Sequence, residues 1–225
     1  MNTVANPTYR QRIGYQAGLL GGFSLVAAAL LVMGDIATRD TIAERNAEDL
    51  LASLAQVIPA SMHDNDLLAN TISLELDLGS EAADAEETSP LLVYRALQGL
   101  DVKAVAFEVV GQGYAGPIRV LLGVDAAGRV LGARVLAHAE TPGLGDKIEV
   151  DRNDWILAFD GRSLKDPAAD GWAVKKDGGI FDQFSGATIT PRAVVKAVKG
   201  GLTLFESHRD TLTASAVVVE EVASD

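Results

Sequence analysis

The sequence of 225 residues contains no cysteine. This absence excludes thiolate-ligated zinc, iron–sulfur clusters, thioether-linked haem, disulfide bonds and cysteine nucleophiles. Only three histidines are present, His63, His138 and His208, and they lie too far apart to form the close pairs on which most histidine metal sites depend. We therefore expect no metal site, and any redox chemistry must use another kind of cofactor.

Basic residues are also scarce, since 19 Lys and Arg stand against 31 Asp and Glu, a formal net charge of −12. Binding to nucleic acid needs a basic face that releases counterions, so this balance argues against a nucleic-acid partner. No nucleophile lies in a GxSxG pattern, which disfavours a hydrolase. A composition of 48% hydrophobic and 22% charged residues is globular, and the length allows one ordinary domain plus an accessory segment.

A long uncharged run lies near the N-terminus. From Ile13 to Met33 there are 21 consecutive residues without a charge, rich in Leu, Ala, Val and Gly. At about 1.5 Å per helical residue, this run spans roughly the hydrocarbon thickness of a bilayer. A secretory signal peptide is the alternative, but its apolar region is normally shorter and ends at a small-residue cleavage site. We therefore predict a retained transmembrane anchor.

The charges on either side of this run indicate an orientation. Arg10 and Arg12 precede it with no acidic residue upstream, whereas acidic residues crowd the other side, although two arginines also lie there. After residue 33, 17 basic and 31 acidic residues leave a charge of −14. The pattern favours an anchor in a bacterial inner membrane and an acidic periplasmic domain. The predicted segments are a cytoplasmic tail at 1–12 and a transmembrane helix at 13–33.

Beyond the anchor, the pattern of apolar residues predicts an α+β fold. Thr41 and Glu44 match a capping box, and the helical spacing that follows ends at Pro59, so we expect a membrane-proximal helix within 34–60. Within domain residues 61–225, apolar and polar residues alternate at 72–78, and several segments from Val102 onward are rich in β-forming residues, which predicts an antiparallel meander. The expected strands are 72–78, 102–110, 118–124, 130–138 and 172–176, with an acidic loop at 81–89 and helices at 148–159 and from Thr190 onward.

Three glycine-rich segments interrupt these elements: 113–118, 140–147 and 182–188. In the last segment, residues 185–187 are small enough for close backbone approach, and Thr188 comes shortly before the expected helix start at Thr190. Unpaired amides and the positive end of a helix dipole stabilise a phosphate at such a position. A phosphate-bearing ligand is therefore expected, although the segment is neither a P-loop nor a Rossmann fingerprint.

The order GYAGPI, ETPGLGDK and DxxSGAT, behind a single N-terminal anchor, resembles the FMN-binding domain family, and within it the G subunits of Rnf electron transport complexes. The similarity extends from the anchor to the helix after Thr188. It implies that FMN is joined through its phosphate to the Thr188 hydroxyl, as a phosphoester, by a dedicated flavin transferase. The motif that this enzyme would read consists of Asp182, Ser185, Gly186, Ala187 and Thr188.

The same resemblance implies that the other two segments lie near the flavin. They comprise Thr141, Pro142, Gly143, Leu144 and Gly145, together with Gly113, Tyr114, Gly116, Pro117 and Ile118. No side chain is expected to act as a catalytic acid or base, because a flavin tethered by its phosphate exchanges electrons through its ring. For Asp182, Lys147 and Tyr114, flavin contact and the ordinary roles of turn residue, solvated charge and packing residue stay equally open.

The resemblance further implies an electron-relay subunit without turnover of its own. It would act in an ion-translocating complex that couples electron transfer between NADH and ferredoxin to ion transport, beside other membrane subunits that include a second flavin carrier. One alternative is the C subunit of the sodium-pumping NADH:quinone reductase, which shares the motif and anchor. Another is an anchored periplasmic binding or adaptor module without redox activity, but it leaves the order of the three motifs unexplained.

Overall fold

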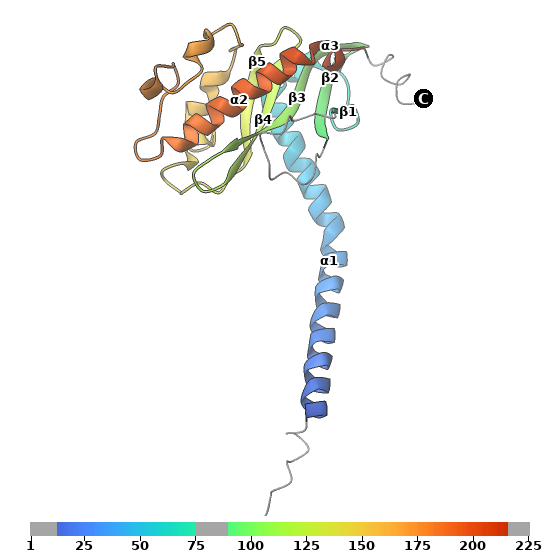
Figure 1. Ribbon diagram of the computed structural model, residues 1–225. Helices are drawn as coiled ribbons and strands as arrows, with labels where there is room; N and C mark the ends of the chain where they lie inside the picture. Colours follow the sequence, from blue (N-terminus) through green and yellow to red (C-terminus); the bar gives the residue numbers. More distant parts are fainter. Residues whose placement is uncertain (1–12, 75–89, 216–225) are drawn as a thin grey trace, which may run out of the picture. The chain divides into compact units, whose positions relative to one another are not determined.

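A computed structural model of the chain describes residues 13–74 and 90–215 (Figure 1). The chain divides into two units, Met1–Asp49 and Leu50–Asp225. Several predictions concern residues outside the described ranges: Arg10 and Arg12, the later part of the strand expected at 72–78, and the acidic loop at 81–89.

The first described element is a single helix, α1 (Ile13–Val57). It covers both the predicted anchor and the predicted membrane-proximal helix, so the expectation of a new helix start at Thr41 is wrong. The sequence of α1 contains no proline, and an isolated glycine such as Gly34 costs a helix only about 1 kcal/mol. The apolar part reaches a mean hydropathy of 2.0, and by length and composition α1 is able to cross a membrane.

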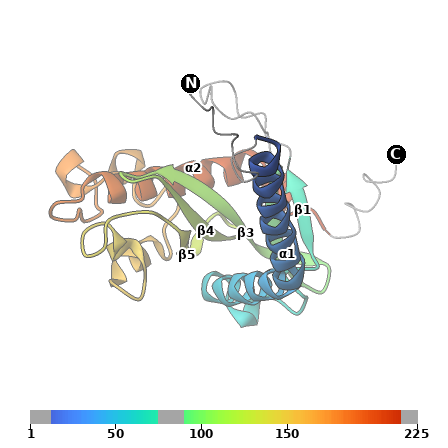
Figure 2. The ribbon, with the colours of Figure 1, turned by 90° about the horizontal axis from the view of Figure 1, so that it is seen from below.

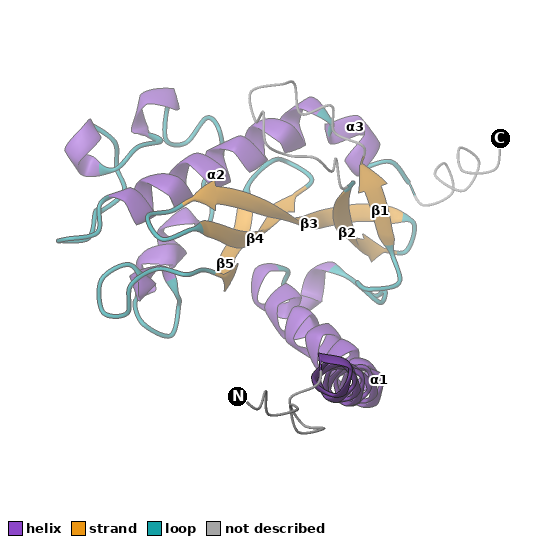
Figure 3. Ribbon diagram, turned by 60° about the horizontal axis from the view of Figure 1, so that its bottom comes forward, coloured by secondary structure: helices purple, strands orange, loops and turns teal. Residues whose placement is uncertain are grey.

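A five-stranded antiparallel sheet forms the centre of the second unit, in the order β1-β2-β3-β4-β5 (Figures 1 and 3). The strands are β1 (Thr71–Leu74), β2 (Leu91–Gln98), β3 (Asp101–Gln112), β4 (Pro117–Asp125) and β5 (Val130–Ala137). Each strand pairs with its neighbour in the chain, so the predicted meander and the α+β class are confirmed. Strand β2 was not predicted, because its sequence is nearly all apolar without alternation and contains Arg95.

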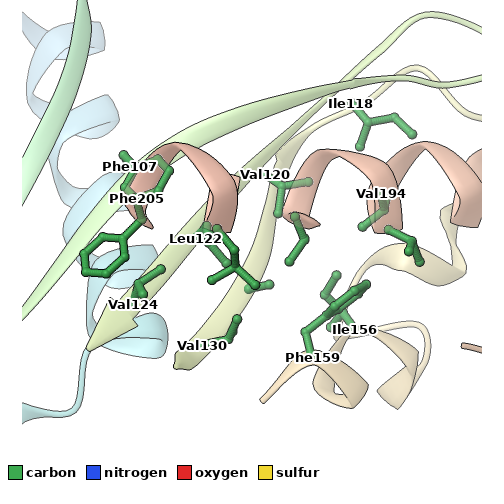
Figure 4. Close-up of a cluster of buried hydrophobic side chains, with 14 of the residues drawn as sticks. Phe107, Ile118, Val120, Leu122, Val124, Val130, Ile156, Phe159, Val194 and Phe205 are labelled. Carbon is green, nitrogen blue, oxygen red and sulfur yellow. The ribbon is translucent and has the colours of Figure 1, made fainter. Parts of the chain in front are cut away.

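Helix α2 (Ile189–Ser207) covers one face of the sheet and contacts β3 and β4 (Figure 2). The predicted apolar stripe of α2 is buried, and Val194 and Phe205 lie in one core with Phe107, Leu122 and Ile156 (Figure 4). A short helix, α3 (Arg209–Leu212), follows α2. Because strand residues alternate between faces, the large apolar residues of β3 and β4 in this core all point towards this helix.

The last turns of α1 pack on the opposite face of the sheet, which small residues line. Leu54 and Val57 are fully buried there, in a cluster with three alanines, Ala96, Ala104 and Ala106. Gly123 and Gly132 pair with each other across β4 and β5, and a Cβ atom on Gly123 would overlap the carbonyl oxygen of Val57. The missing side chains let the helix backbone approach the sheet. A 3-10 turn, η2 (Ala60–Met62), follows α1.

Between β5 and α2 the chain forms short 3-10 segments where longer elements were predicted. They are η3 (Asp146–Ile148), η4 (Asp154–Phe159), η5 (Ala169–Gly171) and η6 (Lys175–Asp177). The single helix expected at 148–159 is wrong, because Asn153 is extended and its side chain accepts a hydrogen bond of 2.9 Å from the Trp155 amide. The strand expected at 172–176 is also wrong. Val174 is buried but makes only an isolated bridge to Phe181.

Candidate functional site

The first glycine-rich segment, 113–118, forms the tight connection between β3 and β4. The Gly113 amide donates to the carbonyl oxygen of Gly116 at 2.9 Å, and Pro117 begins β4 opposite Gln112. The Ile118 side chain is fully buried in the core. Tyr114, at the tip of the connection, is 74% exposed, so it is not a core residue of this domain.

The second segment, 140–147, follows β5 as a compact turn. The amides of Leu144 and Gly145 both donate to the carbonyl oxygen of Thr141, at 3.1 and 3.0 Å. Gly143 has a φ of +78°, a left-handed conformation that favours glycine. The turn exposes residues 141–144 and leaves Lys147 half-buried.

The third segment, 182–188, precedes α2 and is held in place by buried aromatic side chains. Phe184 is buried against Trp155, with ring centroids 5.2 Å apart, and the Trp155 ring N–H donates to the carbonyl oxygen of Asp182 at 2.7 Å. The amide of Ala187 donates to the carbonyl oxygen of Phe184 across a turn in which Gly186 has a φ of +84°. These anchors leave Asp182, Ser185 and Gly186 exposed.

The side chain of Asp182 interacts with a charged neighbour at the surface. Its carboxylate pairs with the Lys175 ammonium at 2.5 Å, and both side chains are exposed. Exposed pairs of this kind contribute little to stability. Asp182 therefore acts as an anchored turn residue in this structure, with its carboxylate at the surface.

Two threonines near the start of α2 differ in what their hydroxyl groups contact. The helix begins at Ile189, one residue earlier than the predicted start at Thr190, and Thr188 is its N-cap. Thr188 is half-buried and makes no capping hydrogen bond through its side chain. Thr190 is fully buried, and its hydroxyl donates to the carboxylate of Glu140. Of the two threonines, only Thr188 is partly exposed.

Glu140 connects all three segments, and sequence reasoning missed it. Its side chain is buried, and Oε1 accepts a hydrogen bond of 3.0 Å from the Ala115 amide while Oε2 accepts from Thr190. A Cβ atom on Gly113 would overlap Oε1, and one on Gly145 would lie 2.9 Å from Oε2. The signal in the sequence was an acidic residue three positions after the end of an apolar strand, at the start of a glycine-rich turn.

The three segments together line a pocket of about 290 Å³, which we name the Thr188 pocket. Its lining consists of Tyr114, Glu140, Thr141, Leu144, Gly145, Gly186, Ala187, Thr188, Ile189 and Thr190. Seven of the predicted site residues therefore meet here, from all three motifs. The others do not line this pocket: Gly113, Gly116, Pro142 and Gly143 lie in the turns, Pro117 and Ile118 begin β4, and Asp182 and Ser185 line a different pocket.

Asp182 and Ser185 line a second pocket, of about 450 Å³, which we name the Trp155 pocket. Lys147, Asn153 and Trp155 also contribute to it. The segment 182–188 thus contributes residues to two pockets, with Thr188 in one and the exposed polar residues of the motif in the other.

The Thr188 pocket has the features that a flavin nucleotide needs. The N-terminus of α2 offers amide donors and a positive dipole for a phosphate, next to the Thr188 hydroxyl. Tyr114, Leu144 and Ile189 are large apolar side chains with 74%, 43% and 45% exposure, suited to a planar aromatic ring. The residues that are present therefore fit FMN. Among the described residues, no group of His, Asp and Glu side chains has the arrangement of a metal site.

An ion pair joins the first turn of α2 to the 3-10 segment η6. Arg192, in the first turn of α2, donates two hydrogen bonds of 2.6 Å to the carboxylate of Asp177 in η6. These hydrogen bonds from Arg192 lower the pKa of the Asp177 carboxyl, and the same hydrogen bonds raise the pKa of Arg192. The pair links the segment before the third motif to the helix after it.

Comparison with known proteins identifies the family. The model of the FMN-binding domain family matches residues 113–203, which include all three glycine-rich segments. The G subunit of the ion-translocating oxidoreductase complex of Cereibacter sphaeroides is 59% identical over 196 residues, covering 87% of this chain and 85% of that protein. Its counterpart in Stutzerimonas stutzeri is 47% identical over 204 residues, covering 91% of this chain and 85% of that protein.

Among solved structures, NqrC of Shewanella oneidensis matches with a TM-score of 0.45 and 21% identity, over 69% of this chain and 73% of that chain. The two sequence matches, by contrast, extend over most of the chain at much higher identity. The chain therefore belongs to the family of G subunits of ion-translocating oxidoreductase complexes, and its residues 113–203 form an FMN-binding domain.

Proposed function

We propose that this chain is the electron-relay flavoprotein subunit of its complex and carries FMN covalently, through a phosphoester, on Thr188. One observation carries the proposal: Thr188, the partly exposed threonine at the start of α2, lines the pocket where all three motifs meet. Thr190, two residues later, is an unsuitable acceptor because it is fully buried and bonded to Glu140.

The attachment is a phosphoryl transfer in which the flavin keeps its oxidation state. The Thr188 oxygen attacks the phosphorus of a flavin nucleotide whose phosphate is activated as a phosphoanhydride and presented by the flavin transferase. The Oγ–P bond forms, the phosphoanhydride bond breaks, and the departing nucleotide phosphate takes the electron pair while the hydroxyl proton is released. The chain gains the mass of FMN less one water.

The other residues around Thr188 have two proposed roles, recognition by the transferase and contact with the flavin. The exposed Asp182, Ser185 and Gly186 are available to the transferase, with Ala187 beside them. Tyr114, Leu144 and Ile189 would cover the flavin ring, while Thr141 and Gly145 shape the pocket wall. When bound, FMN supplies transfer of one or two electrons, and the protein contributes apolar packing and backbone donors that adjust its potential.

We also propose the placement of the chain in its membrane. Residues 13–33 would cross the bacterial inner membrane, with residues 1–12 in the cytoplasm and the domain at 61–225 in the periplasm. The apolar composition of α1 supports the anchor, and the orientation depends on Arg10 and Arg12. The partners would be the other membrane subunits, including a second flavin carrier, in a complex that exchanges electrons between NADH and ferredoxin.

The test is the intact mass of the full chain purified from native membranes, with in-gel flavin fluorescence after denaturation. We expect wild type to be fluorescent and heavier by FMN less one water, and both signals to vanish in Thr188→Val, which lacks the hydroxyl. Thr203→Val removes an exposed hydroxyl further along α2 and should keep both signals. A dark, unmodified wild-type protein would overturn the covalent assignment, and a fluorescent Thr188→Val protein would move the attachment to another residue.

A further inference from the structure

The buried carboxylate of Glu140 has no part in the attachment chemistry, yet it bonds to two segments that lie far from it in the sequence. Ala115 is 25 residues away and Thr190 is 50 residues away. Glu140 is 5% exposed, and its side-chain partners among the described residues are neutral donors rather than a cation. A buried carboxylate is retained only where hydrogen bonds replace its lost hydration, so these two donors must stay in place.

The backbone around Glu140 is fixed as well. The Glu140 amide donates to Nδ1 of His138 at 3.0 Å, which requires that this nitrogen carries no proton. The proton therefore resides on Nε2, which donates to the carboxylate of Glu149 at 2.7 Å. His138 thus fixes the position at which the chain leaves β5, and with it the direction of the Glu140 side chain.

Two glycines allow the neighbouring backbones to close around the carboxylate. Any side chain at Gly113 would collide with Oε1, and one at Gly145 would come within 3.0 Å of both Oε2 and the Thr190 hydroxyl. One glycine belongs to the first motif and the other to the second. The buried Glu140 side chain therefore explains why position 113 in the first motif and position 145 in the second are both glycine.

We propose that Glu140 is the positioning residue of the flavin attachment site. By accepting hydrogen bonds from Ala115 and Thr190, it fixes the β3–β4 connection and the first turn of α2 to the turn at 140–145. Thr188 precedes that turn of α2 by one residue, so its hydroxyl is held at the Thr188 pocket and Thr190 is kept out of reach. This inference rests on the proposed attachment of FMN at Thr188.

The negative charge of Glu140 has a separate consequence, which concerns the reduction potential of the bound flavin. The carboxylate lines the same pocket as Thr188, where burial weakens screening by water. Reduction adds negative charge to a flavin, and a nearby carboxylate opposes that change. Glu140 therefore lowers the reduction potential of FMN bound there.

The experiment measures how fast a purified flavin transferase, supplied with its flavin nucleotide donor, loads FMN onto the detergent-solubilised full chain. We expect Glu140→Ala and Thr190→Val to slow loading by about tenfold or more, because each leaves a buried hydrogen-bonding group without its partner. Glu140→Gln should stay within about threefold of wild type, since its amide oxygen still accepts from Ala115. Glu206→Gln, which alters an exposed pair with Arg209, serves as the matched control and should load normally.

Loading of Glu140→Ala at the wild-type rate would overturn the positioning role. The midpoint potential of FMN in loaded Glu140→Gln tests the charge, and we expect it to lie above that of wild type. An unchanged potential would contradict the electrostatic part and reduce Glu140 to a structural residue. Failure of the attachment itself is recognised separately, because wild type would then remain unloaded or Thr188→Val would load.

Discussion

The two faces of the sheet are packed in different ways. On the α2 face, large side chains such as Phe107 and Leu122 interlock with Val194 and Phe205 (Figure 4). On the α1 face, alanines and a facing pair of glycines bring the helix backbone itself against the strands. On one face, large side chains of helix and sheet pack against each other, whereas on the other the buried side chains of α1, such as Leu54 and Val57, pack against small residues of the sheet.

This difference has a consequence for the site. Helix α2 carries Thr188 at its N-terminus, so the large side chains beneath α2 also determine where the attachment point lies. The end of α1 contacts the opposite face and contributes no residue to the Thr188 pocket. Substitutions on the α1 face should therefore change only the stability of the domain, whereas substitutions on the α2 face should also change the geometry of the site.

Removing side-chain volume from the α2 face should have the largest effect. Phe107→Ala deletes a fully buried ring, which costs about 3–5 kcal/mol of unfolding free energy. The measurement is guanidinium unfolding of the detergent-solubilised full chain, followed by fluorescence of the buried Trp155 and Trp172. Leu100→Ala, at an exposed position, is the control and should change little. A cost for Phe107→Ala near that of the control would contradict the importance of this face.

Adding volume to the α1 face should have the next largest effect. Gly123→Ala places a methyl group on the Val57 carbonyl oxygen, and because backbone cannot move aside cheaply, we expect a loss of about 1–3 kcal/mol. Gly132→Ala is the matched variant, since its Cβ would lie 3.1 Å from the Val57 Cα, and its cost should be smaller. The same unfolding experiment compares them. No measurable cost for Gly123→Ala would contradict the contact between α1 and the sheet.

The smallest effect comes from two adjacent glycines in α2. Gly200 is exposed with nothing near its Cβ position, so Gly200→Ala should stabilise the domain by about 0.5–1 kcal/mol through helix propensity. A Cβ atom on Gly201 would lie only 2.7 and 2.8 Å from the side chains of Val109 and Leu122, so Gly201→Ala should destabilise the domain by roughly 1 kcal/mol. Opposite signs in thermal unfolding would support the packing of α2, whereas two stabilising changes would count against it.

Much of the sheet could be predicted because its signals are local. Strands β3 to β5 are rich in valine and other apolar residues, and the turn between β4 and β5 is specified by Asp125, whose carboxylate accepts from the Ala127 and Arg129 amides. Strand β2 could not be predicted, because periodicity alone does not distinguish its short apolar run from a buried helical segment. The 3-10 segments near Trp155 and Trp172 were predicted as longer elements, since burial in an aromatic cluster produces the same apolar pattern.

The amino-acid sequence by itself determined the apolar helix, the antiparallel meander and the three glycine-rich motifs that identify the family. These depend on composition, on periodicity and on short runs of residues. Tertiary structure alone decided which residues meet at the pocket and which of two nearby threonines stays partly exposed. The reason is that Glu140 becomes a partner of Ala115 and Thr190 only when folding brings together segments 25 and 50 residues apart. A contact between such distant segments produces no periodicity or short motif in the sequence.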